Sequence, residues 1–417
     1  MKKITVFAAI LALCVAVSAQ SLNVSSAYEA YNRGYLKKAV GYLEKAQVHE
    51  QTKEDAQTWY ISTLVYCQIG DEIKQGTKKG KELATLVSNW SNKAYTALLN
   101  WKQFDTKGEY TSKVTPFFQY VSNEYYNRAV NEVNAADHMP DYNVAMLLCD
   151  TAVQLGNTVG DKDLAATANL LAGRCAKALG KTDVMKEYFL PLTKGKAKKG
   201  IDVDFVYQAM FQTYVSEKDT NNAFRIARNY QKNYPEDYKA DALLASAYMM
   251  KGNVEEGVKT VNAAVEKCAN DPTQKAEALC VAAAVYESAK DYTGAEAKYK
   301  EALAINPAAY AANAGLASMN YNRAADKITE AEKVPLDDAT GLYDKLTNES
   351  KELFKISIPY FNAAINYIDG LPENQKPTMR QALYNNLKGL NTAYARLDQL
   401  VDAKEVEARI KELEAGK

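Results

Sequence analysis

The chain has 417 residues with 51 basic and 51 acidic side chains, so its formal net charge is zero. A hydrophobic content of 47% and a charged content of 24% are ordinary for a soluble folded protein and exclude wholesale disorder. Without excess positive charge there is no electrostatic basis for nucleic-acid binding, and 2 His leave little for a metal site or a proton relay. The length suits two or three domains or one long array of repeats.

The first twenty residues have the pattern of an export signal. Two lysines precede an apolar stretch, Ile4–Val17, and small residues follow it up to Ala19. The 14 apolar residues fall short of the ~20 that span a bilayer, so this order is typical of a cleaved secretory signal peptide. We assign residues 1–19 to the signal peptide and expect an exported chain, in the periplasm or cell envelope, with no integral membrane segment after cleavage. The alternative is lipidation at Cys14, which the bulky Leu13 before it disfavours.

Residues 20–160 show three weak repeats of a helix-pair pattern. In such a pair, small residues lie where two antiparallel helices approach most closely, and large residues fill the space to the next pair. The first repeat turns at Gly34, the second keeps only its aromatic spacing, and the third spans residues 118–157 around an inserted loop at 135–142. The positions that carry these repeats are Ala39, Leu43 and Ala46, then Trp59 and Tyr66, then Ala145, Cys149 and Ala152.

Tyrosine is unusually frequent, with 29 residues against 10 phenylalanines. A tyrosine ring buries a large area while its hydroxyl reaches a rim or a carbonyl, which suits packing between helix pairs. The densest aromatic group comprises Tyr110, Phe117, Phe118, Tyr120, Tyr125 and Tyr126. We expect this group to serve packing; stacking on a sugar or a peptide is the alternative.

Residues 161–309 form the central repeats. A fourth repeat covers residues 162–195 and includes Gly173 and Gly180. A basic connector at 194–200 follows it. We expect this connector to be a solvated loop, and contact with an anionic partner is the alternative.

Repeats five to seven follow in register. Their equivalent tyrosines Tyr214, Tyr248 and Tyr286 stand 34 and 38 residues apart, and the connection at 268–273 holds the four extra residues. The seventh repeat is the clearest, with the sequence AEALCVAAAVYESAKDYTGAEAKYKEALAINP from Ala276. Its pattern positions are Leu279, Ala282, Ala283 and Tyr286 on the first helix and Ala295, Tyr299, Ala302 and Pro307 on the second. Matching positions are Tyr207, Met210, Ala223, Ala227 and Pro235 in the fifth repeat and Leu244, Ala245, Gly257, Val261 and Ala264 in the sixth.

This 34-residue arrangement resembles the tetratricopeptide repeat (TPR), and the match spans the whole seventh repeat. The resemblance implies an all-α solenoid of about nine antiparallel helix pairs in a right-handed superhelix, whose first helices line a concave groove that binds peptides or partner domains. The implied groove positions are Tyr60, Leu64, Gln208, Gln212, Ser246, Met249, Glu277 and Glu287. Their mixed amide, hydroxyl, thioether and carboxylate groups suit an extended polypeptide. The alternative is that partners dock on the inserted loops.

Residues 310–417 hold two more repeats. The eighth begins at Leu316 and Ala317, is interrupted by a loop at 335–338, and resumes with a helix from Tyr343. Its second-helix positions appear only at Ser357, Phe361 and Ala364. The ninth uses Leu387, Leu390, Tyr394 and Ala403. The charged tail from Asp398 suits a capping helix whose apolar residues are Val401, Val406 and Ile410.

Searches for chemistry find nothing to assign. The sequence contains no G-x-S-x-G, no H-E-x-x-H and no glycine-rich phosphate loop. His49 and His138 fall at a helix end and in a loop, where we expect surface residues. We therefore predict no enzyme activity, no catalytic residue, no cofactor and no metal ligand.

Five cysteines remain after signal cleavage, namely Cys67, Cys149, Cys175, Cys268 and Cys280. Their odd number, wide spacing and lack of a C-x-x-C pair indicate buried free thiols rather than a disulfide framework. We expect no disulfide between Cys268 and Cys280, because the pattern places the two side chains on different sides of the array.

The signal peptide and the irregular repeats together resemble the exported TPR proteins of Bacteroidota-type Gram-negative bacteria. The first hypothesis is therefore an exported scaffold or adaptor that binds other proteins or peptides in its groove and binds no nucleic acid. The alternative is a glycan-handling accessory protein of an outer-membrane uptake system. That alternative predicts a lipidated Cys14 and exposed aromatic platforms.

Overall fold

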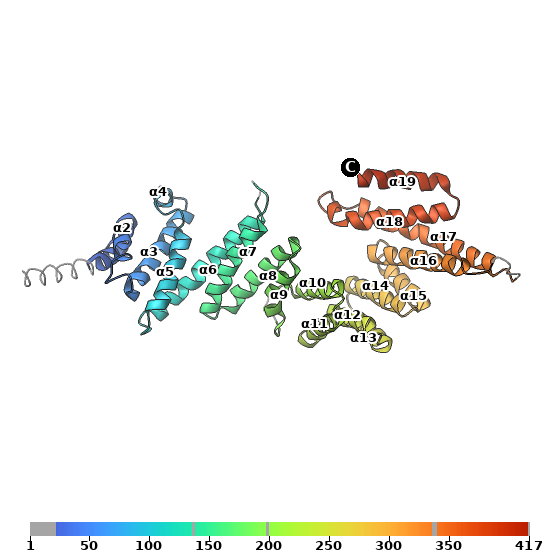
Figure 1. The fold of residues 1–417 in the computed structure, drawn as a ribbon, viewed down its shortest axis with the longest axis horizontal. Helices are drawn as coiled ribbons and strands as arrows, with labels where there is room; N and C mark the ends of the chain where they lie inside the picture. Colours follow the sequence, from blue (N-terminus) through green and yellow to red (C-terminus); the bar gives the residue numbers. More distant parts are fainter. Residues whose placement is uncertain (1–21, 136–137, 197–199, 336–339, 416–417) are drawn as a thin grey trace, which may run out of the picture. The chain divides into compact units, whose positions relative to one another are not determined.

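The computed structural model describes residues 22–135, 138–196, 200–335 and 340–415. All regular structure within these ranges is helical, which confirms the all-α prediction (Figure 1). The expected signal peptide and Cys14 lie outside the described residues.

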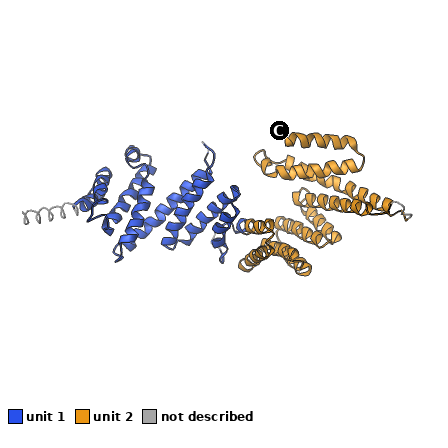
Figure 2. Cartoon of the chain, in the orientation of Figure 1, with its two compact units in different colours: residues 1–206 blue, residues 207–417 orange. Residues whose placement is uncertain are grey.

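Two compact units divide the chain between Val206 and Tyr207 (Figure 2). Each unit is a stack of consecutive helix pairs. The boundary falls within the central repeats. The grouping into 20–160, 161–309 and 310–417 follows the repeat pattern and stays a prediction.

Unit 1 holds repeats one to four. Its helices are residues 22–32, α2 (Leu36–Ala46), α3 (Ala56–Lys74), α4 (Lys78–Leu86), α5 (Trp90–Phe104), α6 (Thr111–Val133), α7 (Tyr142–Thr158), α8 (Lys162–Ala178) and α9 (Thr182–Phe189), with the 3-10 turn η1 (Leu190–Thr193). Helix pairs stand where the pattern predicts repeats one, three and four. Repeat two differs, because the short α4 is interposed and α3 packs mainly against α5. The sequence pattern assigned neither α4 nor α5.

Unit 2 holds repeats five to nine. Its helices are α10 (Val203–Ser216, which begins just before the boundary), α11 (Thr220–Asn233), α12 (Tyr238–Met250), α13 (Val254–Lys267), α14 (Pro272–Ser288), α15 (Tyr292–Ile305), α16 (Tyr310–Ala331), α17 (Leu342–Asp369), α18 (Lys376–Arg396) and α19 (Leu400–Glu414). The new helix predicted from Tyr343 is α17. It is continuous, so the second helix of repeat eight starts at the loop and not near Ser357.

The turn between the two helices of a pair has one recurring backbone geometry. A single residue adopts a left-handed conformation two positions after the first helix ends, at Gly34, Gly180, Lys218, Gly252, Lys290 and Asp398. In repeat seven, the N–H of Lys290 donates to the carbonyl of Glu287 (2.8 Å), and the N–H of Asp291 donates to that of Tyr286 (2.9 Å). This pair of bonds is a Schellman motif, which closes a helix by satisfying its last carbonyls. The same turn therefore orients both helices in six of the repeats.

The next residue after this turn differs between repeats. In repeats five, six and seven it is Asp219, Asn253 or Asp291, whose side chain accepts from a backbone N–H in the first turn of the second helix. In repeats one, four and nine it is Tyr35, Lys181 or Gln399, and no side chain caps the helix. Repeats five to seven thus carry a local stabilising contact, worth ~1 kcal/mol, that repeats one, four and nine lack at this turn.

The core is assembled from neighbouring pairs, as the repeat pattern predicts. One cluster joins Leu279 and Ala283 of α14 and Tyr299 of α15 to Leu316 of α16, all of them at most 4% exposed. The Tyr299 ring lies over Gly315, where a Cβ would come within 2.3 Å of the ring. Each pair therefore covers its apolar face with the next pair, which is how a repeat array gains stability.

The structure confirms the packing expected for two of the aromatic residues and corrects one position of the predicted capping helix. Phe118 and Tyr125 are buried (1% and 6% exposed), which confirms the packing interpretation for these members of the aromatic group. The tail helix α19 packs on α18 through Ile410 and Val406. Val401 is 73% exposed, so its predicted place in the capping core is wrong. Val401 precedes Ile410 by nine residues, which places it on the opposite side of the helix from the buried Ala403 and Ile410.

Candidate functional site

The predicted groove residues of repeats five to seven lie on the first helices α10, α12 and α14. Gln212 is exposed, while Gln208, Ser246 and Met249 are half-buried. Met249 packs on a core cluster, and its Sδ would lie 2.6 Å from a Cβ at position 257. Ser246 donates its hydroxyl within its own helix, to the carbonyl of Ala242 (3.1 Å). Gln212 therefore offers the most accessible polar group of these four.

The two predicted glutamates of α14 differ in their surroundings. Glu277 is exposed and accepts a hydrogen bond from the hydroxyl of Tyr238 on α12, which links two neighbouring first helices. Burial and this contact with Glu277 raise the pKa of Tyr238. Glu287 is half-buried, and burial raises the pKa of its carboxyl group. This region of unit 2 thus presents negative charge, part of it incompletely solvated.

The predicted residues of α3 lie in unit 1. Leu64 is only 8% exposed and belongs to the core, so its side chain offers little surface to a partner. The Tyr60 ring stacks on the Tyr110 ring, with centroids 4.8 Å apart and an interplanar angle of 28°. The prediction that these positions bind a partner stays a prediction.

Tyr60 belongs to a tyrosine row, which we define as Tyr28, Tyr31, Tyr60 and Tyr110. Tyr28 and Tyr31 are stacked with centroids 6.3 Å apart, and Tyr28 is 43% exposed. Burial and the neighbouring Tyr60 and Tyr28 raise the pKa of Tyr31, which places the two stacks close together. The row joins the first helix of repeat one, α3 and the start of α6.

A second aromatic group in unit 1 is tied up internally. The Tyr120 hydroxyl donates to Asp71 (2.6 Å), and Lys74 lies over the rings of Trp90 and Tyr120 at 5.0 and 4.6 Å. Lys74 also pairs with Glu124 at 2.6 Å. These contacts join α3, α5 and α6, so the Tyr120 side chain serves packing between helices.

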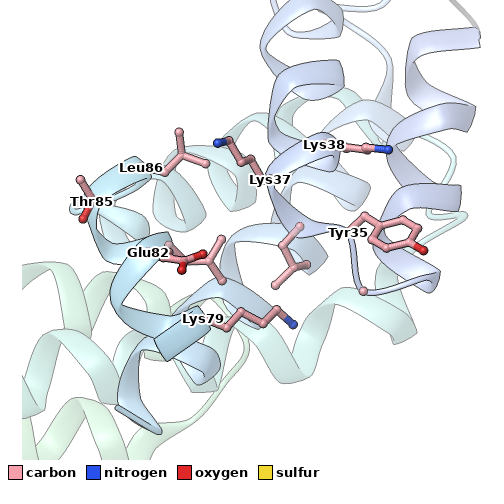
Figure 3. A pocket seen from close by; sticks show the side chains of 10 residues that line it. Tyr35, Lys37, Lys38, Lys79, Glu82, Thr85 and Leu86 are labelled. Atoms are coloured by element: carbon pink, nitrogen blue, oxygen red, sulfur yellow. The ribbon is translucent and has the colours of Figure 1, made fainter. Parts of the chain in front are cut away.

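The hollow that stands out in unit 1 is a pocket between α2 and α4, with a volume of about 1010 Å³ (Figure 3). Its lining residues are Gly34, Tyr35, Leu36, Lys37, Lys38, Lys79, Glu82, Leu83, Thr85 and Leu86. Leu36 and Leu83 are buried, whereas Tyr35 and Leu86 are 55% and 45% exposed. The pocket thus has an apolar floor and an accessible, mostly basic rim.

Sequence reasoning missed this pocket because it is built from departures from the repeat pattern. The uncapped start of α2 supplies one wall, and the unassigned helix α4 supplies the other. Two signals were available. Lys37 and Lys38 stand three and four residues after the turn glycine Gly34, in a first helical turn where the dipole favours acidic residues, and Thr77 before Lys78 is a typical helix cap.

The cysteines are free in the described residues, and no bond joins Cys268 to Cys280, as predicted. Burial raises the pKa of Cys149 to about 12 and those of Cys175 and Cys280 to about 11. Since the thiolate is the reactive form, these thiols are poor nucleophiles at neutral pH. They act as small apolar residues.

Histidine and metal chemistry have little support. His138 lies within 3.0 Å of Glu132, at a half-exposed position. No cluster of three or more metal-ligating side chains occurs in the part of the chain that the structure describes. Among the same residues, none of the helices is both long and apolar enough to cross a membrane.

Comparison with known proteins finds only loose structural likenesses. No protein-family model and no curated protein sequence matches the chain. YrrB, a TPR protein with an unusual peptide-binding site, is 18% identical with a TM-score of 0.33, over 49% of this chain and 95% of YrrB. The human IFIT1 dimer with m7Gppp-AAAA is 14% identical with a TM-score of 0.34, over 95% and 90%. A Rap protein complexed with Competence and Sporulation Factor is 12% identical with a TM-score of 0.27, over 96% and 98%.

The helix pairs, their recurring turn and the buried pattern positions make the chain a TPR-like helical-repeat protein. This description rests on its own geometry, since the likenesses to solved structures are too loose to argue from. The resemblance to Bacteroidota proteins stays a prediction.

Proposed function

We propose that the chain is an exported interaction scaffold that binds polypeptide partners through the first-helix surface of repeats five to seven, in the periplasm or cell envelope. The observation that carries the proposal is the chemistry of this surface. It combines the accessible amide of Gln212, the exposed carboxylate of Glu277 and the 36% exposed Met250. Spaced hydrogen-bonding groups with an adaptable thioether suit an extended polypeptide better than a phosphate or a metal.

Export is supported by residues 1–19, which have the order of a signal peptide. The mass of the mature chain, purified from its native host, distinguishes cleavage after Ala19 from lipidation at Cys14. A lipidated Cys14 would contradict the export route proposed here and favour the glycan alternative.

The test of the binding surface is capture of partners from envelope extract by the chain from residue 20 onwards. We expect Gln212→Glu with Met250→Glu to weaken capture, because both side chains are accessible and neither forms the core. Met249 is avoided, since its packing against α13 would confuse lost binding with lost folding. The matched control is Val254→Glu with Ala263→Glu, two exposed positions on the second helix α13.

Two outcomes of this experiment would contradict the groove proposal. Capture that survives the first-helix pair but fails in the α13 pair would show that the second helices bind partners. Capture that fails only when the loop at 335–341 is replaced by a Gly/Ser linker of equal length would place the site on the inserted loop. Either outcome overturns the groove proposal.

The tyrosine row favours a second candidate, the glycan-handling accessory protein. Sugars stack on aromatic rings, and Tyr28 and Tyr60 are partly accessible in unit 1. We expect Tyr28→Ala with Tyr31→Ala to abolish retention of the chain on oligosaccharide arrays if this candidate is correct. An array on which the unmodified chain binds no glycan would exclude it.

A further inference from the structure

We propose that the pocket between α2 and α4 binds a segment of a partner polypeptide in which a carboxylate stands beside a leucine-like apolar side chain. This site belongs to unit 1, whereas the groove residues of repeats five to seven belong to unit 2. The proposal rests on the proposed function only in taking the partner to be a polypeptide.

The apolar half of the ligand follows from the floor and rim of the pocket. Leu36 and Leu83 are 2% and 5% exposed and form a closed apolar base. Leu86, 45% exposed, and the Tyr35 ring, 55% exposed, rise beside it. An apolar side chain placed here would cover surface that is now in contact with water, which is the main favourable contribution to such binding.

The acidic half follows from the α2 wall. Lys37 extends from α2 toward Leu86 on α4, whereas Lys38 points away from α4 (Figure 3). No ion pair or hydrogen bond is recorded for the Lys37 side chain within the described residues. Lys79 is already paired with Glu72 at 2.6 Å, and Lys38 lies over the Tyr35 ring at 5.3 Å. Lys37 is therefore the cation that remains for a ligand.

The backbone at the same wall adds to this charge. Tyr35 provides no side-chain cap, and the first turn of α2 contains no acidic residue. In the described structure, the N–H groups of Leu36 and Lys37 have no recorded acceptor. The start of a helix favours a carboxylate through its free amides, and the Lys37 ammonium group on the same turn favours one as well. Glu82, the acidic lining residue, stands on α4, so the carboxylate of the ligand is expected on the α2 side.

The shape of the pocket favours a polypeptide over a free fatty acid. Small-molecule sites bury most of their ligand, and an acyl chain needs such enclosure along its length. Here two of the apolar lining residues, Tyr35 and Leu86, are about half exposed, so the hollow covers one or two side chains of a longer ligand. A polypeptide can place one apolar side chain in the pocket while the rest of its chain stays in water.

The experiment is selection of random twelve-residue displayed peptides on the chain from residue 20 onwards. We expect enrichment of Asp or Glu next to Leu, Ile, Phe or Met. Enriched peptides are then synthesised with a fluorescent label and their affinity is measured by anisotropy. We expect Lys37→Glu and Leu86→Ser each to weaken binding about tenfold or more, as for central contacts of an interface. A glutamate in the first turn of α2 favours that helix, so Lys37→Glu should not unfold it.

The matched controls are Lys45→Glu, at an exposed position on the same helix, and Val48→Ser, at a position that is 76% exposed beyond it. Neither lines the pocket, so both should bind peptide as the unmodified chain does. Amidation of the peptide C-terminus, compared with Asp→Asn or Glu→Gln inside the peptide, separates a terminal carboxylate from a side-chain one. Binding that tolerates both changes overturns the proposal.

Two further outcomes separate this proposal from the proposed function. If the peptides lose affinity for Gln212→Glu with Met250→Glu but keep it for Lys37→Glu and Leu86→Ser, the groove binds polypeptides and the pocket proposal is wrong. If selection enriches no peptide at all, both proposals fail.

Discussion

Repeats one and seven share the same turn and differ in the residue that follows it. Gly34 and Lys290 have φ values of 75° and 63°, and both turns close the first helix with the same pair of backbone bonds. Asp291 then caps α15 by accepting from the N–H of Gly294 (2.9 Å), while Tyr35 leaves the start of α2 uncapped. Where the sequence keeps the pattern, the helix satisfies its own polar groups. Where the sequence departs from the pattern, as at Tyr35, the first backbone N–H groups of the helix remain available to a ligand.

The largest effect we predict comes from overpacking the equivalent core positions of these two repeats. Ala295 and Ala39 are both 0% exposed and lie five residues after the turn residue. We expect tryptophan at either position to cost about 3 kcal/mol, because both sites are fully enclosed and the ring must displace neighbouring side chains. Hydrogen exchange should rise across α14–α16 in Ala295→Trp and only near the N-terminus in Ala39→Trp, because each repeat is coupled mainly to its neighbours. Equal exchange in repeats one and seven of either variant would contradict this coupling.

Exchanging the caps should give the next largest effect. We expect Asp291→Ala to destabilise α15 by about 1 kcal/mol and Tyr35→Asp to stabilise α2 by a similar amount. Local amide exchange in the two helices measures both changes. Tyr35→Asp should also weaken binding of acidic apolar peptides, since the new carboxylate occupies the same amides and repels the ligand. If Tyr35→Asp stabilises α2 but leaves the peptide affinity unchanged, the free amides at the start of α2 take no part in peptide binding.

Exchanging the turn residues should have a smaller effect. Lys290 pays for its left-handed backbone with steric strain that glycine avoids, but glycine also loses more chain entropy on folding. We therefore expect Lys290→Gly to stabilise repeat seven by about 0.5 kcal/mol and Gly34→Lys to destabilise repeat one by a similar amount. Chemical denaturation of the two variants against the unmodified chain measures the difference. Opposite signs from those stated would show that the side chain of Lys290 makes a compensating contact.

The smallest effect concerns the charge of repeat seven. Burial raises the pKa of Glu287, so the folded chain holds this proton more tightly than the unfolded chain. The resulting stability is present below the ordinary glutamate pKa and is lost as the pH rises through the folded-state pKa. Glu287→Gln should therefore change nothing in acid and stabilise slightly at neutral pH, in thermal melts at both pH values. A destabilised variant at neutral pH would mean that the carboxylate has a favourable partner.

Much of the fold was predictable from the sequence because the repeat pattern is a packing rule. Ala295, Tyr299 and Ala302 recur with one spacing, and all three are buried. Repeat two was not predictable to the same degree, because the pattern there reduces to Trp59 and Tyr66 and gives no sign of which later helix covers α3. The start of α17 was predicted at Tyr343, but its continuity was not, because the interruption at 335–338 made the positions near Ser357 look like a separate second helix.

The candidate site was predictable only in part. The pattern indicates which positions lie on first helices, yet it does not tell how far neighbouring helices cover them. Leu64 lies in the core and Met249 packs against Gly257, whereas Gln212 remains accessible. The α2–α4 pocket follows no pattern at all, because it depends on where an extra helix comes to rest.

The sequence by itself determined the helix pairs, their turns and the small residues at which helices meet, because these depend on local backbone preferences and on a periodic apolar face. The odd number and wide spacing of the cysteines also indicated free thiols, and the described cysteines are free. Only the tertiary structure decided which polar groups stay uncovered. Tyr35, Lys37 and Leu86 become one surface because α4 packs beside the uncapped start of α2, and accessibility of this kind depends on the packing of helices that are distant in the sequence.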